Sequence, residues 1–109
     1  MAKSISIEKV QRLLEKNPDK LPVIIHKKGD SQNIIKFMIP TEATVLDFLY
    51  VLRKRINLEP TQSIYLSVKD SNNKYVMVAT NLNMGQIYEQ YKTKDLLLEM
   101  IYCEENTFG

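Results

Sequence analysis

The chain has 109 residues, of which 44% are hydrophobic and 26% charged, a composition typical of one small globular domain. A net charge of +2 is too small to indicate nucleic-acid binding. The single Cys excludes an internal disulfide and favours a cytoplasmic setting. No stretch reaches the roughly 18 apolar residues of a membrane span, and the start lacks the apolar run of a signal peptide. We therefore expect any membrane attachment to come from a covalent modification or a partner.

The first part of the chain predicts one helix followed by two strands. Ser6 can cap a helix over residues 7–16, where apolar residues recur at helical spacing, and Pro18 ends it. Residues 21–27 and 34–39 are apolar runs separated by a short polar turn. This pattern favours a hairpin.

The strongest helix signal covers residues 44–57. Thr44 and Asp47 form a plausible capping pair, and apolar side chains follow at core spacing. Three basic residues, 53–55, occupy the last turns, where positive charge complements the helix dipole. The same basic run could also be no more than a solvated helix end.

Two strands, a short helix and a last strand follow, over residues 63–69, 74–79, 84–91 and 96–103. Without the first helix, this order is the β-grasp order of ubiquitin. It predicts that the last strand lies parallel to the first at the sheet centre. The fold class is therefore α+β: a ubiquitin-like β-grasp, with a mixed four-stranded sheet and a packed helix, plus a short N-terminal helical extension.

Six stretches of the chain resemble the autophagy-related protein 8 family, the GABARAP and light chain 3 ubiquitin-like modifiers. They are "NPDKLPVII", "IIKFMIP", "TVLDFLYVLRKRINL", "IYLSV", "NMGQIYEQYKTKD" and "YCEENTFG". The chain departs from the family pattern in a shorter N-terminus, an abbreviated loop between the first strands, and a longer segment at 69–81. We expect a helical extension over 1–19, a β-grasp domain over 20–103 and a flexible conjugation tail over 104–109.

The resemblance implies that the terminal Gly109 is adenylated, passed on as a thioester and joined to phosphatidylethanolamine. Glycine suits this chemistry because a Cβ would obstruct attack on the carbonyl. Phe108 would be gripped by the processing and activating enzymes. The implied partners are activating and conjugating enzymes and a deconjugating cysteine protease. The chain would lie in the cytoplasm and, after lipidation, on the autophagosome membrane, where two acyl chains anchor it firmly.

The second strand is expected at a sheet edge, where an extended peptide can add itself as a further strand. The resemblance implies that this peptide carries an aromatic-x-x-aliphatic motif beside acidic residues. The implied aromatic pocket is lined by Leu13, Pro22, Lys36, Met38 and Leu97. The implied aliphatic pocket is lined by Phe37, Ile39, Pro40, Phe48, Val51 and Leu52, with Arg55 facing the acidic flank.

Some of these positions keep alternatives open. Val51 and Leu52 could equally be plain core, whereas Phe37 and Met38 are strand neighbours that face opposite sides and cannot share one core. Leu97 stands where the family commonly has phenylalanine, which leaves the preferred peptide open.

Other chemistry and other functions have less support. His26 and Cys103 are the only His and Cys, so a metal site of the usual type is excluded; we expect no cofactor and no enzyme activity. The alternatives to lipid conjugation are a modifier joined to a protein lysine and a β-grasp interaction domain that is never conjugated. The last would tolerate loss of Gly109.

Overall fold

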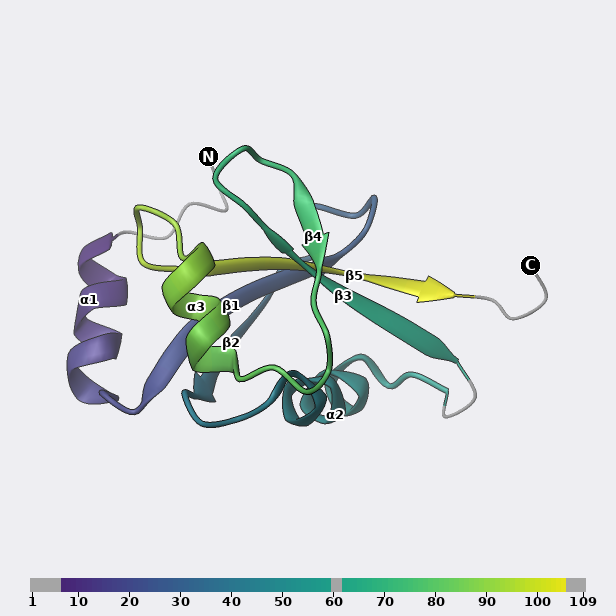
Figure 1. Cartoon of the computed structure of the whole chain (residues 1–109), viewed down its shortest axis with the longest axis horizontal. Coiled ribbons are helices and arrows are strands. Elements are labelled where there is room, and N and C mark those ends of the chain that lie inside the picture. Colours follow the sequence, from purple (N-terminus) through teal and green to yellow (C-terminus); the bar gives the residue numbers. More distant parts are fainter. Residues whose placement is uncertain (1–6, 60–61, 106–109) are drawn as a thin grey trace.

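The computed structural model describes residues 7–59 and 62–105, which form three helices and five strands (Figure 1). The predicted order of elements is confirmed. The elements are α1 (Ile7–Lys16), β1 (Lys20–Lys27), β2 (Ile35–Pro40), α2 (Val45–Ile56), β3 (Ser63–Lys69), β4 (Tyr75–Met77), α3 (Met84–Tyr91) and β5 (Leu98–Glu105). The predicted cap Ser6 and the tail residues Phe108 and Gly109 lie outside the described residues.

The strands form one mixed sheet in the order β2-β1-β5-β3-β4, as a β-grasp fold requires. β5 runs parallel to β1 at the centre, with Val23 opposite Leu98, and the other pairs are antiparallel. β2 lies at an edge, which confirms the prediction for this strand.

The sheet has five strands rather than the four predicted, because the short β4 pairs with β3. Asp70 makes the hairpin turn: its Oδ1 accepts hydrogen bonds from the backbone N–H groups of Asn72, at 2.8 Å, and Lys74, at 3.0 Å. Asn73 takes the left-handed conformation that such a turn favours, with φ 62°. β4 is nevertheless only three residues long, shorter than the predicted strand 74–79.

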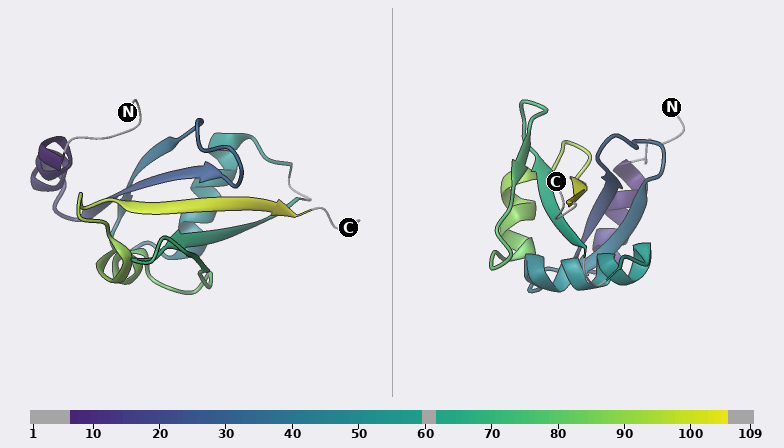
Figure 2. Two further views of the ribbon diagram at one scale, coloured as in Figure 1. Left: turned by 90° about the horizontal axis from the view of Figure 1, so that it is seen from above. Right: turned by 90° about the vertical axis from the view of Figure 1, so that its right-hand side faces the viewer.

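The hydrophobic core lies between the sheet and the helices α2 and α3 (Figure 2). Alternate side chains of the central strands enter it, and α2 contributes Phe48 and Leu52, both fully buried. α1 lies instead at the end of the sheet where β1 and β5 begin (Figures 1 and 2). That position brings α1 close to the edge strand β2.

Local sequence signals set the ends of α2. Thr44 and Asp47 form the predicted capping box: the Asp47 N–H donates to Thr44 Oγ1 at 3.2 Å, and the Thr44 N–H donates to Asp47 Oδ2 at 3.0 Å. Asn57 ends the helix in the left-handed conformation, with φ 58°. The helix therefore has a fixed register against the sheet.

β5 continues two residues past the predicted strand end at Cys103. Glu104 pairs with Ile64 and Glu105 with Ser63, so the first two residues of the predicted tail belong to the sheet. The division of the chain into 1–19, 20–103 and 104–109 otherwise stays a prediction.

Candidate functional site

A small apolar hollow of about 130 Å³ lies beside the edge strand β2, beneath α1. All five residues predicted for the aromatic pocket line it, although they come from four separate parts of the chain. The complete lining is Val10, Leu13, Pro22, Val23, Ile24, Lys36, Phe37, Met38 and Leu97. The structure thus brings these five side chains together.

α1 forms one wall of this hollow. Val10 is fully buried and holds the helix against the sheet, which places Leu13 on the same face one turn later. Leu13 remains 41% exposed at the rim. Its side chain is therefore free to be covered by a ligand.

The sheet and the loop before β5 form the floor. Pro22 and Met38 are register partners on β1 and β2 and share a face. Leu97 is buried next to them, held by a turn in which the Leu97 N–H donates to Thr93 Oγ1 at 3.3 Å. The hydroxyl of Tyr88 donates to the carbonyl oxygen of Leu96 at 2.8 Å and fixes the same turn to α3.

The residues predicted for the aliphatic pocket divide into a surface group and a supporting group. Phe37 packs edge-to-face on Phe48 at 5.2 Å between ring centroids, and the Arg55 guanidinium lies 5.7 Å from the Phe37 ring centroid. Ile39, Phe48 and Leu52 are buried in the core, and for Leu52 the core interpretation holds. The exposed members are Pro40, Val51 and Arg55.

A cationic rim, which the sequence analysis did not predict, borders the aromatic hollow. A second hollow of about 360 Å³ shares Leu13 and Lys36 with the first and is lined otherwise by Lys9, Arg12 and Lys16. These three follow one another on α1 at i, i+3 and i+7, so one helix face carries all of them. That spacing is the signal that could have identified the rim, and it favours acidic ligands here.

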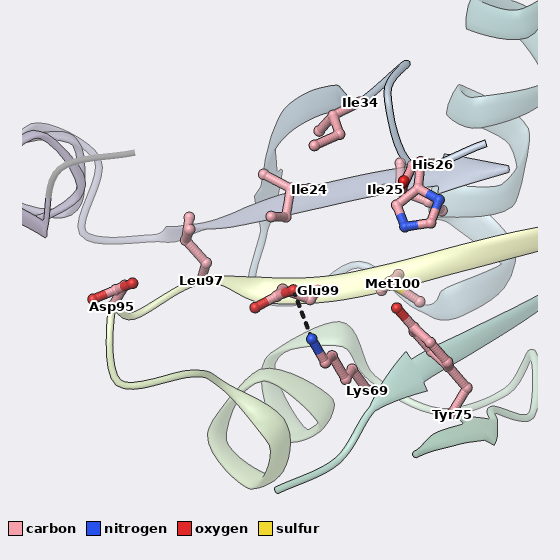
Figure 3. Close-up of a pocket in the computed structure, with 11 residues that line it drawn as sticks. Ile24, Ile25, His26, Ile34, Lys69, Tyr75, Asp95, Leu97, Glu99 and Met100 are labelled. Carbon is pink, nitrogen blue, oxygen red and sulfur yellow. Dashed lines mark ion pairs between the residues drawn. The ribbon is translucent and has the colours of Figure 1, made fainter. Parts of the chain in front are cut away.

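Another cavity, of about 350 Å³, lies next to the aromatic hollow (Figure 3). Ile24 and Leu97 line both this cavity and the aromatic hollow, so they separate the two. Lys69 and Glu99 form an ion pair inside it, with Nζ and Oε1 3.5 Å apart. Its mixed lining points to no particular ligand.

His26 and the acidic side chains are the residues that bear on a possible metal site. His26 is opposite Ile101 across the β1–β5 pairing, and its Nδ1 lies 2.8 Å from the carbonyl oxygen of Lys27. Residues 7–59 and 62–105 contain no group of three His, Cys, Asp or Glu side chains that could hold a metal ion. None of the helices in these ranges is long and apolar enough to cross a membrane.

Comparison with known proteins gives a consistent result. The family model described as autophagy protein Atg8, ubiquitin like, matches residues 6–109. Autophagy-related protein 8d of Arabidopsis thaliana is 41% identical over 102 residues, which cover 90% of this chain and 81% of that protein. Autophagy-related protein 8 of Schizosaccharomyces pombe is 40% identical over 103 residues, covering 91% and 81%.

A solved structure agrees with these relatives. The crystal structure of Trypanosoma brucei ATG8 superposes with a TM-score of 0.77 at 33% sequence identity, covering 97% of this chain and 94% of that one. The chain belongs to the Atg8 family of autophagy ubiquitin-like proteins.

Proposed function

We propose that this chain is a lipid-conjugated autophagy modifier that recruits partners through a groove beside β2. By this groove we mean the aromatic hollow together with the adjacent residues predicted for the aliphatic pocket. In this proposal Gly109 is joined to phosphatidylethanolamine, and partners carry an aromatic-x-x-aliphatic motif. The observation that carries the recruiting role is the apolar hollow next to the open edge of β2, in a chain of the Atg8 family.

Docking would use the backbone and the hollow together. An extended peptide pairs with the free N–H and C=O groups of β2, while its aromatic side chain enters the hollow. Burying an aromatic side chain removes about 150–250 Å² from water, worth roughly 4–6 kcal/mol before the losses of association are subtracted. The cationic rim attracts acidic residues next to the motif and speeds the encounter.

Conjugation would use chemistry supplied by other proteins. Activating and conjugating enzymes carry Gly109 as a thioester, and a cysteine protease reverses the final amide bond. The chain is then a substrate of enzymes and no enzyme itself. It is cytoplasmic before modification and bound to the autophagosome membrane afterwards, because two acyl chains anchor stably where one is marginal.

The conjugation test compares wild type with Gly109→Ala in starved source cells, with the intact modifier weighed by mass spectrometry. We expect a mass gain of one phospholipid in the wild type and none in the variant. A protein-sized adduct would favour conjugation to a lysine instead. An unmodified wild-type chain would refute conjugation and leave the β-grasp interaction domain.

The groove test titrates an acidic peptide with an aromatic-x-x-leucine motif. Phe37→Ala and Arg55→Ala should both weaken binding of this peptide. For Arg55→Ala we expect Kd to rise roughly twofold to fivefold, the range of an exposed ion pair. Lys54→Ala, which removes an exposed charge from the adjacent position, serves as the matched control. Equal losses in the Lys54 and Arg55 variants would show a general charge effect and contradict the assignment of Arg55.

A further inference from the structure

The end of β5 is held on one side by the sheet and on the other by a side chain. The pairing of β1 with β5 ends at Lys27 opposite Tyr102, whereas the pairing of β3 with β5 continues to Glu105. Among residues 7–59 and 62–105, the strand partner of residues 103–105 is therefore β3 alone. On the β1 side, the contact is made by Lys27 with Glu104.

Glu104 contacts two other chain segments through its carboxylate. Its Oε2 lies 3.5 Å from Lys27 Nζ at the end of β1, and its Oε1 accepts a hydrogen bond from Gln62 Nε2, just before β3, at 3.4 Å. We call Lys27, Gln62 and Glu104 the Glu104 clamp. Both carboxylate oxygens are thus engaged at the point where the sheet ends.

We propose that the Glu104 clamp positions the conjugated end of the chain for the activating enzyme by keeping Glu104 and Glu105 in the sheet. This inference rests on the proposed function of Gly109. Gly109 comes four residues after Glu105 in the sequence, and four residues span at most about 14 Å. The enzyme's active site must therefore come within that distance of the end of β5.

The benefit of the clamp is pre-organisation. An enzyme that grips an extended tail has to order the backbone of each residue that it binds, and this weakens binding. Glu104 and Glu105 are already ordered by β3 and by the clamp. Releasing them should therefore raise the KM of the activating enzyme for this chain and leave kcat unchanged.

The clamp is unsuited to a mainly stabilising role. Lys27 and Glu104 form their ion pair at the surface, with 48% and 27% of their side chains exposed, and pairs of this kind contribute little to folding. A variant without the pair should thus unfold at nearly the wild-type temperature. Folding and positioning can therefore be measured separately.

The enzyme test uses full-length chain and the purified activating enzyme, with thioester formation as the readout. Lys27→Met breaks the ion pair without changing the tail, and we expect KM to rise roughly twofold to fivefold, the range of an exposed ion pair, at constant kcat. Lys28→Met is the control, because Lys28 is the neighbouring lysine and forms no ion pair within residues 7–59 and 62–105. Equal KM values for the Lys27 variant and wild type would overturn the proposal.

Exchanging the charges of Lys27 and Glu104 distinguishes the clamp from a direct contact between the enzyme and the Glu104 carboxylate. Glu104→Lys alone should raise KM, and adding Lys27→Glu should restore it, because the pair then forms with reversed charges. Failure of the double variant to recover would mean that the enzyme contacts the Glu104 carboxylate itself, which contradicts a clamp.

Amide hydrogen exchange tests the clamp without any enzyme. Lys27→Met should speed the exchange of residues 103–105 relative to Lys28→Met, and unchanged exchange would overturn the clamp even if conjugation proceeds. Conversely, a wild-type chain that forms no thioester would refute the proposed function, while faster exchange in the variant would still establish the clamp in the free chain.

Discussion

Replacing Leu13 by Ala removes one wall of the aromatic hollow, and we expect it to weaken binding of an acidic aromatic-x-x-leucine peptide about fourfold. Fully burying a leucine side chain contributes about 2 kcal/mol. The free chain leaves 41% of Leu13 exposed, and this is the part that a ligand can still cover. The loss is therefore about 0.8 kcal/mol, which corresponds to the fourfold change in Kd.

The matched control is Leu82→Ala. Leu82 is also 41% exposed, but it lies in the segment before α3 and does not line the hollow. Fluorescence polarisation with a labelled peptide gives Kd for both variants, and thermal unfolding shows whether both remain folded. Unchanged affinity in the Leu13 variant, or equal losses in the two variants, would refute the assignment of the hollow as the aromatic pocket.

Three further predictions concern the elements that support the hollow. Gly85→Ala should lower the free energy of unfolding by about 1–3 kcal/mol in chemical denaturation, because its Cβ would lie 2.7 Å from the backbone oxygen of Thr41; a change below about 0.5 kcal/mol would contradict this close approach. Tyr88→Phe should lower it by about 1 kcal/mol through loss of the hydrogen bond to Leu96. Burial raises the pKa of Tyr88 above its ordinary value of 10.0, so the stability that this shift contributes is present below pH 10.0 and lost as the pH rises through the folded pKa. Denaturation series at rising pH should show a smaller alkaline decline in Tyr88→Phe than in the exposed control Tyr50→Phe.

The β-grasp order could be predicted because local signals in this chain agree with one another. The spacing of apolar residues distinguished helices from strands, and caps such as Thr44 marked where α2 begins. The place of β4 in the sheet was harder to predict, because β4 has only three residues and all of them are exposed. Its place in the sheet depends on the turn made by Asp70 and on pairing with β3.

The groove was only partly predictable. The five residues of the aromatic hollow came from resemblance to a family, since no local pattern links Leu13 with Leu97. The apolar stripe of α2 could not separate core from surface, and the structure puts Phe48 and Leu52 in the core while leaving Val51 exposed. Predicting the cationic rim would have required knowing how α1 lies against β2, which is a tertiary feature.

The end of β5 shows a second limit of sequence patterns. Glu104 and Glu105 are polar and follow a strongly apolar run, so their composition favoured a tail. Their place in the sheet is set by the partner strand, because β3 begins at Ser63 and its backbone pairs with β5 as far as Glu105. Strand length here follows from register and not from hydrophobicity.

The groove and the clamped end use opposite ends of one strand. Leu97 precedes β5 and lines the hollow beside α1, whereas Glu104 lies at the far end of the same strand (Figure 1). A strand rises about 3.3 Å per residue, so the eight residues of β5 hold the two sites roughly 25 Å apart. A chain attached to a membrane through Gly109 would thus carry its groove at the end farther from the attachment point. Because an extended strand cannot shorten, a bound partner would leave that separation unchanged.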